Sequence, residues 1–168
     1  LSLGTGFLAQ SIMRGVDPSA VDEAFICGAL KDYGKLMLTM FRIDDFRRVG
    51  SMATGMPSDD AYRDVFGLTP IELSRELLTT AQMPTMILKS VRAFDPASAD
   101  PETLKEGQDL LHVSELSRRV CSIVGRGDLT HDRYLADVQN TLSDFAKFVP
   151  LDREALEARL VETEGRVT

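Results

Sequence analysis

The hydrophobic positions repeat at helical spacing along almost the whole chain, and they predict an all-α protein. Leu73, Leu77 and Leu78, for example, would share one apolar helix face. No window shows the alternation of β-branched and polar residues that indicates a strand. Glycine, proline and capping residues divide the pattern into helices expected over residues 1–14, 19–41 with a bend or an end at Gly34, 44–55, 59–66, 69–81, 84–94, 101–124, 130–150 and 152–165.

The clearest local signal is a helix start at residues 69–72. Thr69 is expected to be the N-cap, Pro70 the first helical residue and Glu72 the partner that completes a capping box. Residues 24–30 are apolar nearly all round, which predicts a helix buried on several sides. Residues 95–101, rich in Pro, Ala, Ser and Asp, are the one linker-like stretch.

Both ends of the chain are expected to be loosely ordered. The sequence starts at Leu1 without methionine, and we interpret residues 1–168 as one domain that is a C-terminal fragment of a longer chain. Residues 1–7 are expected to be a flexible start, and residues 166–168 a frayed tail.

Length and composition narrow the functional classes. The chain has 168 residues, 43% of them hydrophobic, which fits one domain with a true core. No stretch reaches the roughly 18 apolar residues of a membrane span, so we expect a cytoplasmic protein without a membrane partner. The net charge of −7 opposes binding to a phosphate backbone, so nucleic acid is not an expected partner.

The residues that usually carry chemistry are scarce. Cys27 and Cys121 lie in apolar helical runs and are expected to be free, inert thiols. The only histidines are His112 and His131. His131 with Asp132 has the letters of a metal dyad, but Thr130 as N-cap with an acidic residue in the first turn explains the same residues without a metal.

One short motif has the letters of a cofactor-binding signature but lacks the structural context that the signature needs. Residues 4–9 have the letters of a dinucleotide-binding fingerprint. That fingerprint requires a strand leading into the glycine turn, and no strand is expected here. We therefore expect no cofactor.

Several separated blocks resemble the HDOD domain, the HD-related output domain of bacterial signalling proteins. Residues 23–38, EAFICGALKDYGKLML, are similar to its pattern E-A-F-x-x-G-L-L-H-D-I-G-K-L-L-L. Residues 66–84 resemble F-G-x-x-H-x-x-x-G-x-x-L-L-x-x-W-x-L-P, with Ser74 for the second glycine and Ala81 for the tryptophan. Residues 110–116 resemble a later family helix. The resemblance implies an HD-domain-like bundle of about eight to nine helices.

The same comparison shows where the residues depart from an active HD phosphohydrolase. Such enzymes gather histidines and aspartates around one or two metals that activate water. The dyad's histidine corresponds to Lys31, which we expect to pair with the remaining Asp32. The other ligand positions implied by the resemblance carry Pro70, Ala93 and Phe94, and Glu115 in place of the late aspartate.

These departures predict a non-catalytic regulatory module rather than an enzyme. We expect it to act in signal transduction through protein partners or an upstream domain of the same chain, with no catalytic residue and no metal. The candidate residues of the vestigial pocket are Lys31, Asp32, Pro70, Arg92, Phe94, His112 and Glu115.

Two alternatives stay open at this point. A metal-dependent phosphohydrolase could use a rearranged site of Asp32, Glu115 and His112, although three ligands so poor in histidine are few. Alternatively, the pocket could sense a nucleotide or another small anion through Lys31, Lys35 and Arg92, because lysine and arginine suit phosphates.

Overall fold

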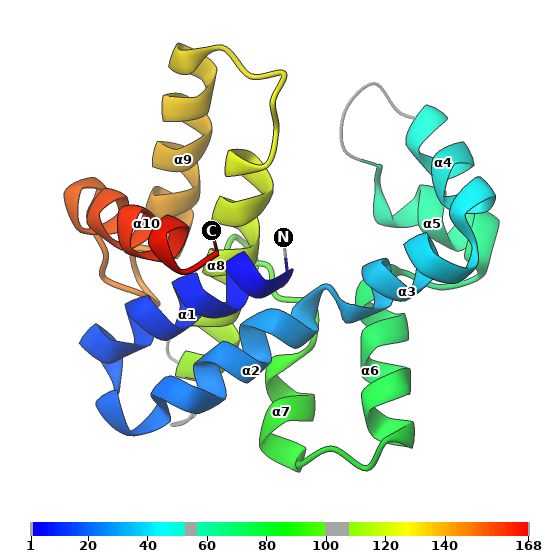
Figure 1. Cartoon of the computed structure of the whole chain (residues 1–168), viewed down its shortest axis with the longest axis horizontal. Helices are drawn as coiled ribbons and strands as arrows, with labels where there is room; N and C mark the ends of the chain where they lie inside the picture. Colours follow the sequence, from blue (N-terminus) through cyan, green and yellow to red (C-terminus); the bar gives the residue numbers. More distant parts are fainter. Residues whose placement is uncertain (1, 53–56, 100–107, 168) are drawn as a thin grey trace.

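The chain folds as an all-α protein, as the hydrophobic pattern predicts. A computed structural model describes residues 2–52, 57–99 and 108–167, and these ranges contain no β-strand. The helices, in chain order, are α1 Ser2–Val16, the short 3₁₀ helix η1 Pro18–Ala20, α2 Val21–Lys31, α3 Tyr33–Phe41, α4 Ile43–Ser51, α5 Asp59–Phe66, α6 Pro70–Thr80, α7 Thr85–Ser90, α8 Asp109–Val124, α9 His131–Phe145 and α10 Arg153–Val167. Figure 1 shows α3, α4 and α5 on one side of the molecule and α9 and α10 on the other.

The main hydrophobic core lies where α1 and α2 pack against α8, with α9 and α10 completing it. Its fully buried side chains include Leu8, Met13, Val113, Leu116 and Phe145. Each such side chain contributes roughly 1.5–3 kcal/mol relative to an exposed one. This core therefore supplies most of the stability of the fold.

The start of the chain belongs to this core, which corrects the expectation of a flexible segment over residues 1–7. Residues 2–7 are the first turns of α1, and Thr5 and Gly6 are buried. The reason is the close packing of α1 on α2, since a Cβ at Gly28 would lie 2.8 Å from the backbone oxygen of Thr5. Leu1 lies outside the described residues.

A second, smaller core holds α3, α4 and α5 together. Its buried members are Leu38, Val49 and Tyr62. This unit is joined to the rest mainly where α3 packs on α6. Gly34 permits that contact, because a Cβ there would lie 2.1 Å from the carbonyl oxygen of Pro70. The helix ends at Lys31 rather than at Gly34, so the glycine serves close packing and not a bend.

The predicted helix starts and ends are partly confirmed. In α6 the capping box forms, with Thr69 Oγ1 accepting from the Glu72 amide at 3.2 Å and the Glu72 carboxylate accepting from the Thr69 amide at 2.7 Å. The Gly67 end of α5 is also confirmed. Two predicted boundaries are wrong: α4 ends at Ser51, before Gly55, and α8 begins at Asp109, after Pro101. Gly55 and Pro101 themselves lie outside the described residues.

Further helix boundaries also differ from expectation. α7 ends at Ser90 instead of reaching Phe94, and the freed Ser90 carbonyl oxygen accepts a hydrogen bond from Lys31. α9 ends at Phe145, and Thr130 stands at its N-cap without a side-chain capping bond. α10 continues to Val167 although residues 166–168 were expected to fray, because Arg166 donates to Gln10 at 2.8 Å. Thr168 lies outside the described residues.

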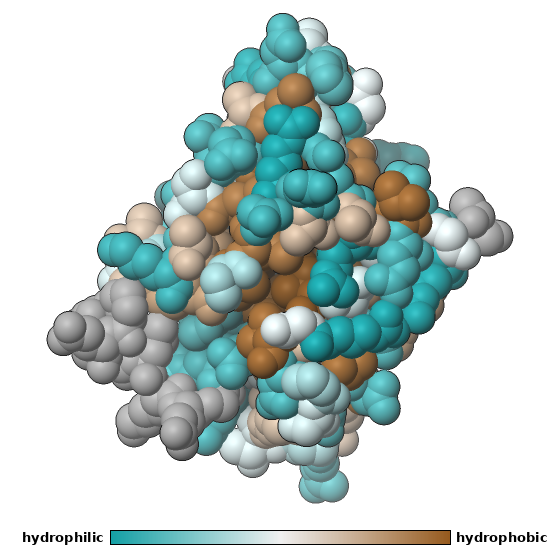
Figure 2. Space-filling view, turned by 90° about the vertical axis from the view of Figure 1, so that its left-hand side faces the viewer, coloured by the Kyte–Doolittle hydropathy of each residue, from teal (hydrophilic) through white to brown (hydrophobic). Residues whose placement is uncertain are grey.

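The surface is mostly polar with local apolar areas. Figure 2 shows the side that carries α1, α9 and α10, where hydrophobic residues gather near the middle and hydrophilic ones surround them. Both cysteines are free, as expected, but only Cys27 is buried and Cys121 is partly exposed. None of the described helices is long and apolar enough to cross a membrane.

Candidate functional site: a buried ion cluster beneath a pocket

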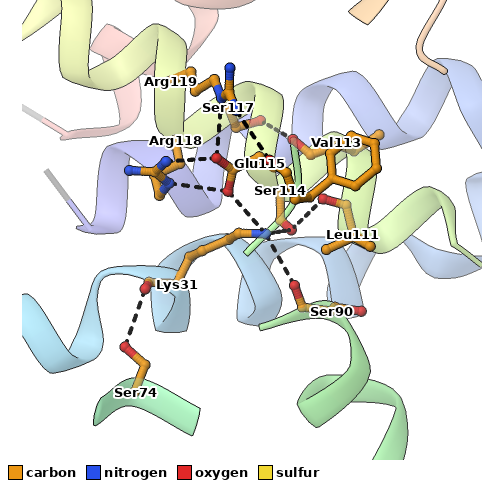
Figure 3. Close-up of polar contacts among 11 residues, drawn as sticks. Lys31, Ser74, Ser90, Leu111, Val113, Ser114, Glu115, Ser117, Arg118 and Arg119 are labelled. Carbon is orange, nitrogen blue, oxygen red and sulfur yellow. Dashed lines mark hydrogen bonds and ion pairs between the residues drawn. The ribbon is translucent and has the colours of Figure 1, made fainter. Parts of the chain in front are cut away.

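Lys31, the last residue of α2, carries its ammonium into the protein interior. Its side chain has no exposed surface, and Nζ lies 3.2 Å from Oε2 of Glu115 in α8. Nζ also donates to the Ser90 carbonyl oxygen at 3.1 Å and to Ser114 Oγ at 3.4 Å (Figure 3). The expected pair with Asp32 is wrong, because the Lys31 ammonium pairs with Glu115 in the interior, whereas Asp32 stands at the junction between α2 and α3.

Glu115 is held by three cations. Arg118 donates to both of its carboxylate oxygens, at 2.6 and 3.1 Å, and Arg119 donates to one of them at 3.2 Å. The Nη2 atom of Arg119 donates to the Phe94 carbonyl oxygen at 3.1 Å. Figure 3 shows Lys31 and the two arginines converging on the carboxylate. We call Lys31, Glu115, Arg118 and Arg119 the Glu115 ion cluster.

The pKa values of Lys31 and Glu115 are both lowered, for different reasons. Burial lowers the pKa of Lys31 to about 8 from 10.5, although the charge of Glu115 and its hydrogen bond oppose this. Burial alone would raise the pKa of Glu115, but the hydrogen bond from Arg118 and the charges of Lys31 and the two arginines outweigh it, so the pKa is lowered. The carboxylate is therefore ionised at neutral pH.

A pocket of about 600 Å³ lies directly above this cluster, between the α3–α5 unit and α8. Five of the predicted pocket residues line it: Lys31, Asp32, Pro70, Phe94 and Glu115. Lys35, Tyr62, Asp59, Asp95, Arg118 and Arg119 also line it. Among the residues that the structure describes, the lining carries four basic side chains, Lys31, Lys35, Arg118 and Arg119, and four acidic ones, Asp32, Asp59, Asp95 and Glu115.

Two predicted pocket residues lie elsewhere. Arg92 is exposed and donates to Gln108 at 3.3 Å, outside the pocket lining. His112 is 4% exposed and packs among rings, with centroids 4.8 Å from Phe94 and 5.1 Å from Phe148. Burial lowers its pKa, so it is a neutral core residue, and its Nε2 atom has no hydrogen-bond partner.

Sequence reasoning missed Arg118 and Arg119, although a signal was present. They stand three and four residues after Glu115, the spacing at which helix side chains form ion pairs. Tyr62 could not be placed in this way, since it reaches the pocket only through the packing of α5 against α3 and α4.

The residues present do not fit a metal. Within residues 2–52, 57–99 and 108–167, no three His, Cys, Asp or Glu side chains are grouped closely enough to hold an ion. The rearranged set of Asp32, Glu115 and His112 is not assembled, because His112 lies in the aromatic core. The ammonium of Lys31 also lies where a cation would have to approach Glu115.

Ser74 fixes the backbone around the pocket from the side of α6. Its hydroxyl oxygen accepts from the Gly34 amide at 2.7 Å and lies 3.2 Å from the Lys31 carbonyl oxygen. The same side chain therefore anchors both the end of α2 and the start of α3. This position corresponds to a glycine in the family pattern, so its polar role was not predicted.

Comparison with known proteins agrees with the resemblance found in the sequence. The family model of the HDOD domain matches residues 1–95, more than half of the chain, and includes Lys31, Asp32 and Pro70. The block at residues 110–116 lies beyond this match. Searches of curated proteins and of solved structures gave no match. On the match of its first 95 residues, the chain belongs to the HDOD domain family.

Proposed function

We propose that this HDOD domain is a non-catalytic regulatory module that acts through contacts with other proteins or protein domains. The observation that carries the proposal is the Glu115 ion cluster beneath the pocket. Lys31, which replaces the histidine of the HD pattern, supplies a fixed positive charge that pairs with Glu115 at 3.2 Å. A divalent ion there would face three protein cations.

The electrostatics of the pocket support the same proposal. Three of the four basic residues in its lining are already bound to Glu115. No His, Cys, Asp or Glu group in the described ranges offers the three or more ligands that a hydrolytic metal centre needs. The pocket therefore lies where the resemblance implies an HD site, and its described residues lack the ligands of one.

The proposal is tested by metal content and turnover together. The purified chain is incubated with Mn²⁺, Fe²⁺ or Zn²⁺, desalted and examined by elemental analysis, and phosphodiesterase and nucleotidase substrates are assayed in parallel. We expect substoichiometric metal and no turnover. Stoichiometric metal, or turnover that is lost in Asp32→Asn but kept in Asp44→Asn, would overturn the proposal. Asp44 is a suitable control because its side chain is 93% exposed on α4.

An anion-sensing role is less favoured by the charges. Within the described part of the lining, the four acidic side chains balance the four basic ones, and Arg92, which we expected to contribute, lies outside. Thermal unfolding with nucleotides and cyclic dinucleotides addresses this role directly. We expect no change in Tm, whereas a rise in Tm that grows with ligand concentration would establish a ligand site instead.

A further inference from the structure

A buried titratable side chain, His112 of α8, has no role in the proposed function. The residue is 4% exposed, and its Nε2 atom has no hydrogen-bond partner among the residues that the structure describes. Buried polar side-chain atoms are nearly always hydrogen-bonded in folded proteins, because leaving one unpaired away from water costs free energy. His112 is therefore a position at which the core tolerates an unsatisfied polar group.

Two aromatic rings from different parts of the chain cover the imidazole. Phe94 follows α7, and its ring centroid lies 4.8 Å from that of His112. Phe148 follows α9, and its ring centroid lies at 5.1 Å. The face of an aromatic ring attracts a charged imidazole, but it replaces few of the hydrogen bonds that water gives to the two N–H groups. We call the two phenylalanine rings the aromatic cage of His112.

The surroundings of His112 disfavour its charged form. Burial is the main reason why the pKa of His112 is lowered from its ordinary value of 6.5. Among the described residues, Asp109, three residues earlier on α8, opposes this shift, whereas Lys31 of α2 and Arg92 after α7 add to it. Phe148 brings no charge from the segment after α9. The imidazole therefore binds a proton more readily when it is uncovered than when the cage is closed.

Phe94 lies on the less firmly held side of the aromatic cage. Residues 92–95, which we call the Phe94 segment, form no helix, and Phe94 is only partly buried. Phe148, in contrast, is a buried member of the main hydrophobic core. Arg119 donates to the Phe94 carbonyl oxygen, but it also donates to Glu115 and keeps that partner when the carbonyl moves away. The Phe94 segment is therefore the part of the cage that opens at the lower free energy.

We propose that the Phe94 segment is an acid-sensitive cover: protonation of His112 displaces the Phe94 ring and opens the pocket beside the Glu115 ion cluster. Ala93, Phe94 and Asp95 are lining residues of that pocket, so movement of the segment changes its wall. The proton comes from solvent and stays on the imidazole. The inference rests on the proposed function in one respect, because it treats the pocket as a contact site whose shape can be regulated.

Proteolysis of the folded chain measures opening of the Phe94 segment, because cleavage tracks the population of the open form when opening and closing are fast. Papain is active at both pH values used here and accepts the sequence Val91–Arg92 before the cleaved bond. Cleavage after Arg92 is measured by mass spectrometry and divided by that of a synthetic peptide of residues 88–97, which removes the pH dependence of papain itself.

The normalised cleavage rate is expected to rise by up to about tenfold from about pH 7.5 to about pH 5.5. This is the limit for an imidazole that stays neutral when covered and has a pKa of 6.5 when uncovered.

Two variants of His112 test whether the imidazole causes this rise. His112→Gln and His112→Leu carry no titratable group, and each is expected to show a normalised rate that does not rise toward acid pH. His131→Gln, which removes the exposed histidine, is the matched control and is expected to keep the rise. Circular dichroism confirms that each variant is folded. An equal rise in the His112 variants overturns the proposal, and so does an equal rise at cleavage sites in α1 and α2, which would indicate global unfolding.

An NMR titration of the unaltered chain tests the same proposal without a change at position 112. The chain has two histidines, and the signal that is missing from His131→Gln identifies His131. We expect His112 to titrate below pH 6.5 and the ring protons of Phe94 to shift over the same pH range. A His112 pKa at or above 6.5, or Phe94 signals that do not move with it, overturns the proposal. Metal content and turnover do not depend on these outcomes, so the proposed function is judged separately.

Discussion

Lys31 places a positive charge where no solvent reaches it. Specific polar partners offset the free-energy cost of burying that charge. Its side chain is fully buried, and its partners are Glu115 and two oxygen acceptors from Ser90 and Ser114. Glu115, in contrast, has two further partners in Arg118 and Arg119. Lys31 therefore depends on Glu115 for its counter-charge, whereas Glu115 would keep two cationic partners without Lys31.

This inequality predicts different costs for removing each partner. Glu115→Leu leaves Lys31 buried without a counter-charge and is expected to cost about 3–5 kcal/mol of unfolding free energy. Lys31→Met leaves Glu115 paired with the arginines and is expected to cost about 1–2 kcal/mol, chiefly from the unpaired Ser90 carbonyl. Urea unfolding at neutral pH measures both values.

The double variant and a surface variant are the controls for this comparison. Lys31→Met combined with Glu115→Leu is expected to be more stable than Glu115→Leu alone, because no charge is then left without its partner at position 31. Arg153→Met breaks the exposed pair with Glu157 and is expected to leave stability unchanged within error. Equal losses in the two single variants would contradict the unequal dependence.

The lowered pKa of Lys31 predicts an unusual pH dependence. Below about pH 8 the amine is charged in both states, and from 8 to its ordinary value of 10.5 the folded protein has released a proton that the unfolded chain still holds. Stability contributed by this group therefore rises with pH across that window. Burial also raises the pKa of Cys27 and Cys121, which lowers stability at high pH.

Comparison with Lys31→Met separates these effects, because the variant keeps both thiols. The difference in unfolding free energy between the unaltered chain and the variant is expected to shift in favour of the unaltered chain by about 1–3 kcal/mol from about pH 7.5 to about pH 10. A difference that stays constant over this range would show that Lys31 keeps an ordinary pKa in the folded state.

At the scale of elements, the contact between α3 and α6 joins the two cores. Gly34 brings the helices together so closely that an added Cβ would lie 2.1 Å from the Pro70 oxygen and 2.7 Å from the Ser74 nitrogen. Backbone atoms cannot give way as a flexible side chain can. The α3–α5 unit therefore depends on this glycine for its position over the pocket.

Gly34→Ala is expected to destabilise the protein by about 1–3 kcal/mol or more through this overlap. Gly50→Ala is the matched control, since it lies in α4 with nothing within 4 Å of the added Cβ. Because alanine favours a helix, the control is expected to gain up to about 1 kcal/mol. Thermal and urea unfolding compare the two, and a Gly34→Ala variant as stable as the control would refute the close contact.

The elements that could be predicted are those specified by local chemistry. The α6 start follows from Thr69, Pro70 and Glu72 alone, because a capping box needs only residues close in sequence. The end of α7 was missed, since it depends on Lys31, fifty-nine residues away along the chain, which takes the Ser90 carbonyl. Long-range contacts of this kind leave no periodic signal.

The same distinction applies to the candidate site. Family resemblance placed Lys31, Asp32, Pro70, Phe94 and Glu115 around one pocket, and they do line it. It could not tell that His112 would be enclosed by Phe94 and Phe148, because the burial of a side chain depends on how distant helices pack. The pairing of Lys31 was likewise decided by tertiary contact.

The whole molecule has a large core and a small one, which differ in the number of apolar side chains that they bury. The α3–α5 core has the buried side chains Leu38, Val49 and Tyr62, whereas the main core draws on helices α1, α2, α8, α9 and α10. Regions with fewer buried apolar groups open at lower free energy than the global unfolding transition.

Native-state hydrogen exchange is expected to reveal this difference. Amides in α4 and α5 should exchange through openings of lower free energy than amides in α1, α2 and α8, with α6 intermediate because it contacts both cores. Urea dependence of the exchange rates separates local from global opening. Uniform protection across all these helices would show that the chain unfolds as a single cooperative unit.

The Glu115 ion cluster also limits which sequence changes could turn the pocket into a metal site. Exchange of Lys31 for histidine would supply a metal ligand, yet Arg118 and Arg119 would still occupy the Glu115 carboxylate and repel a divalent ion. Loss of either arginine alone would weaken the support of a buried carboxylate without creating a ligand. A metal site therefore requires changes at positions 31, 118 and 119 together, and each intermediate sequence would be less stable before binding could compensate. Single substitutions made one at a time are therefore not expected to convert the pocket into a metal site.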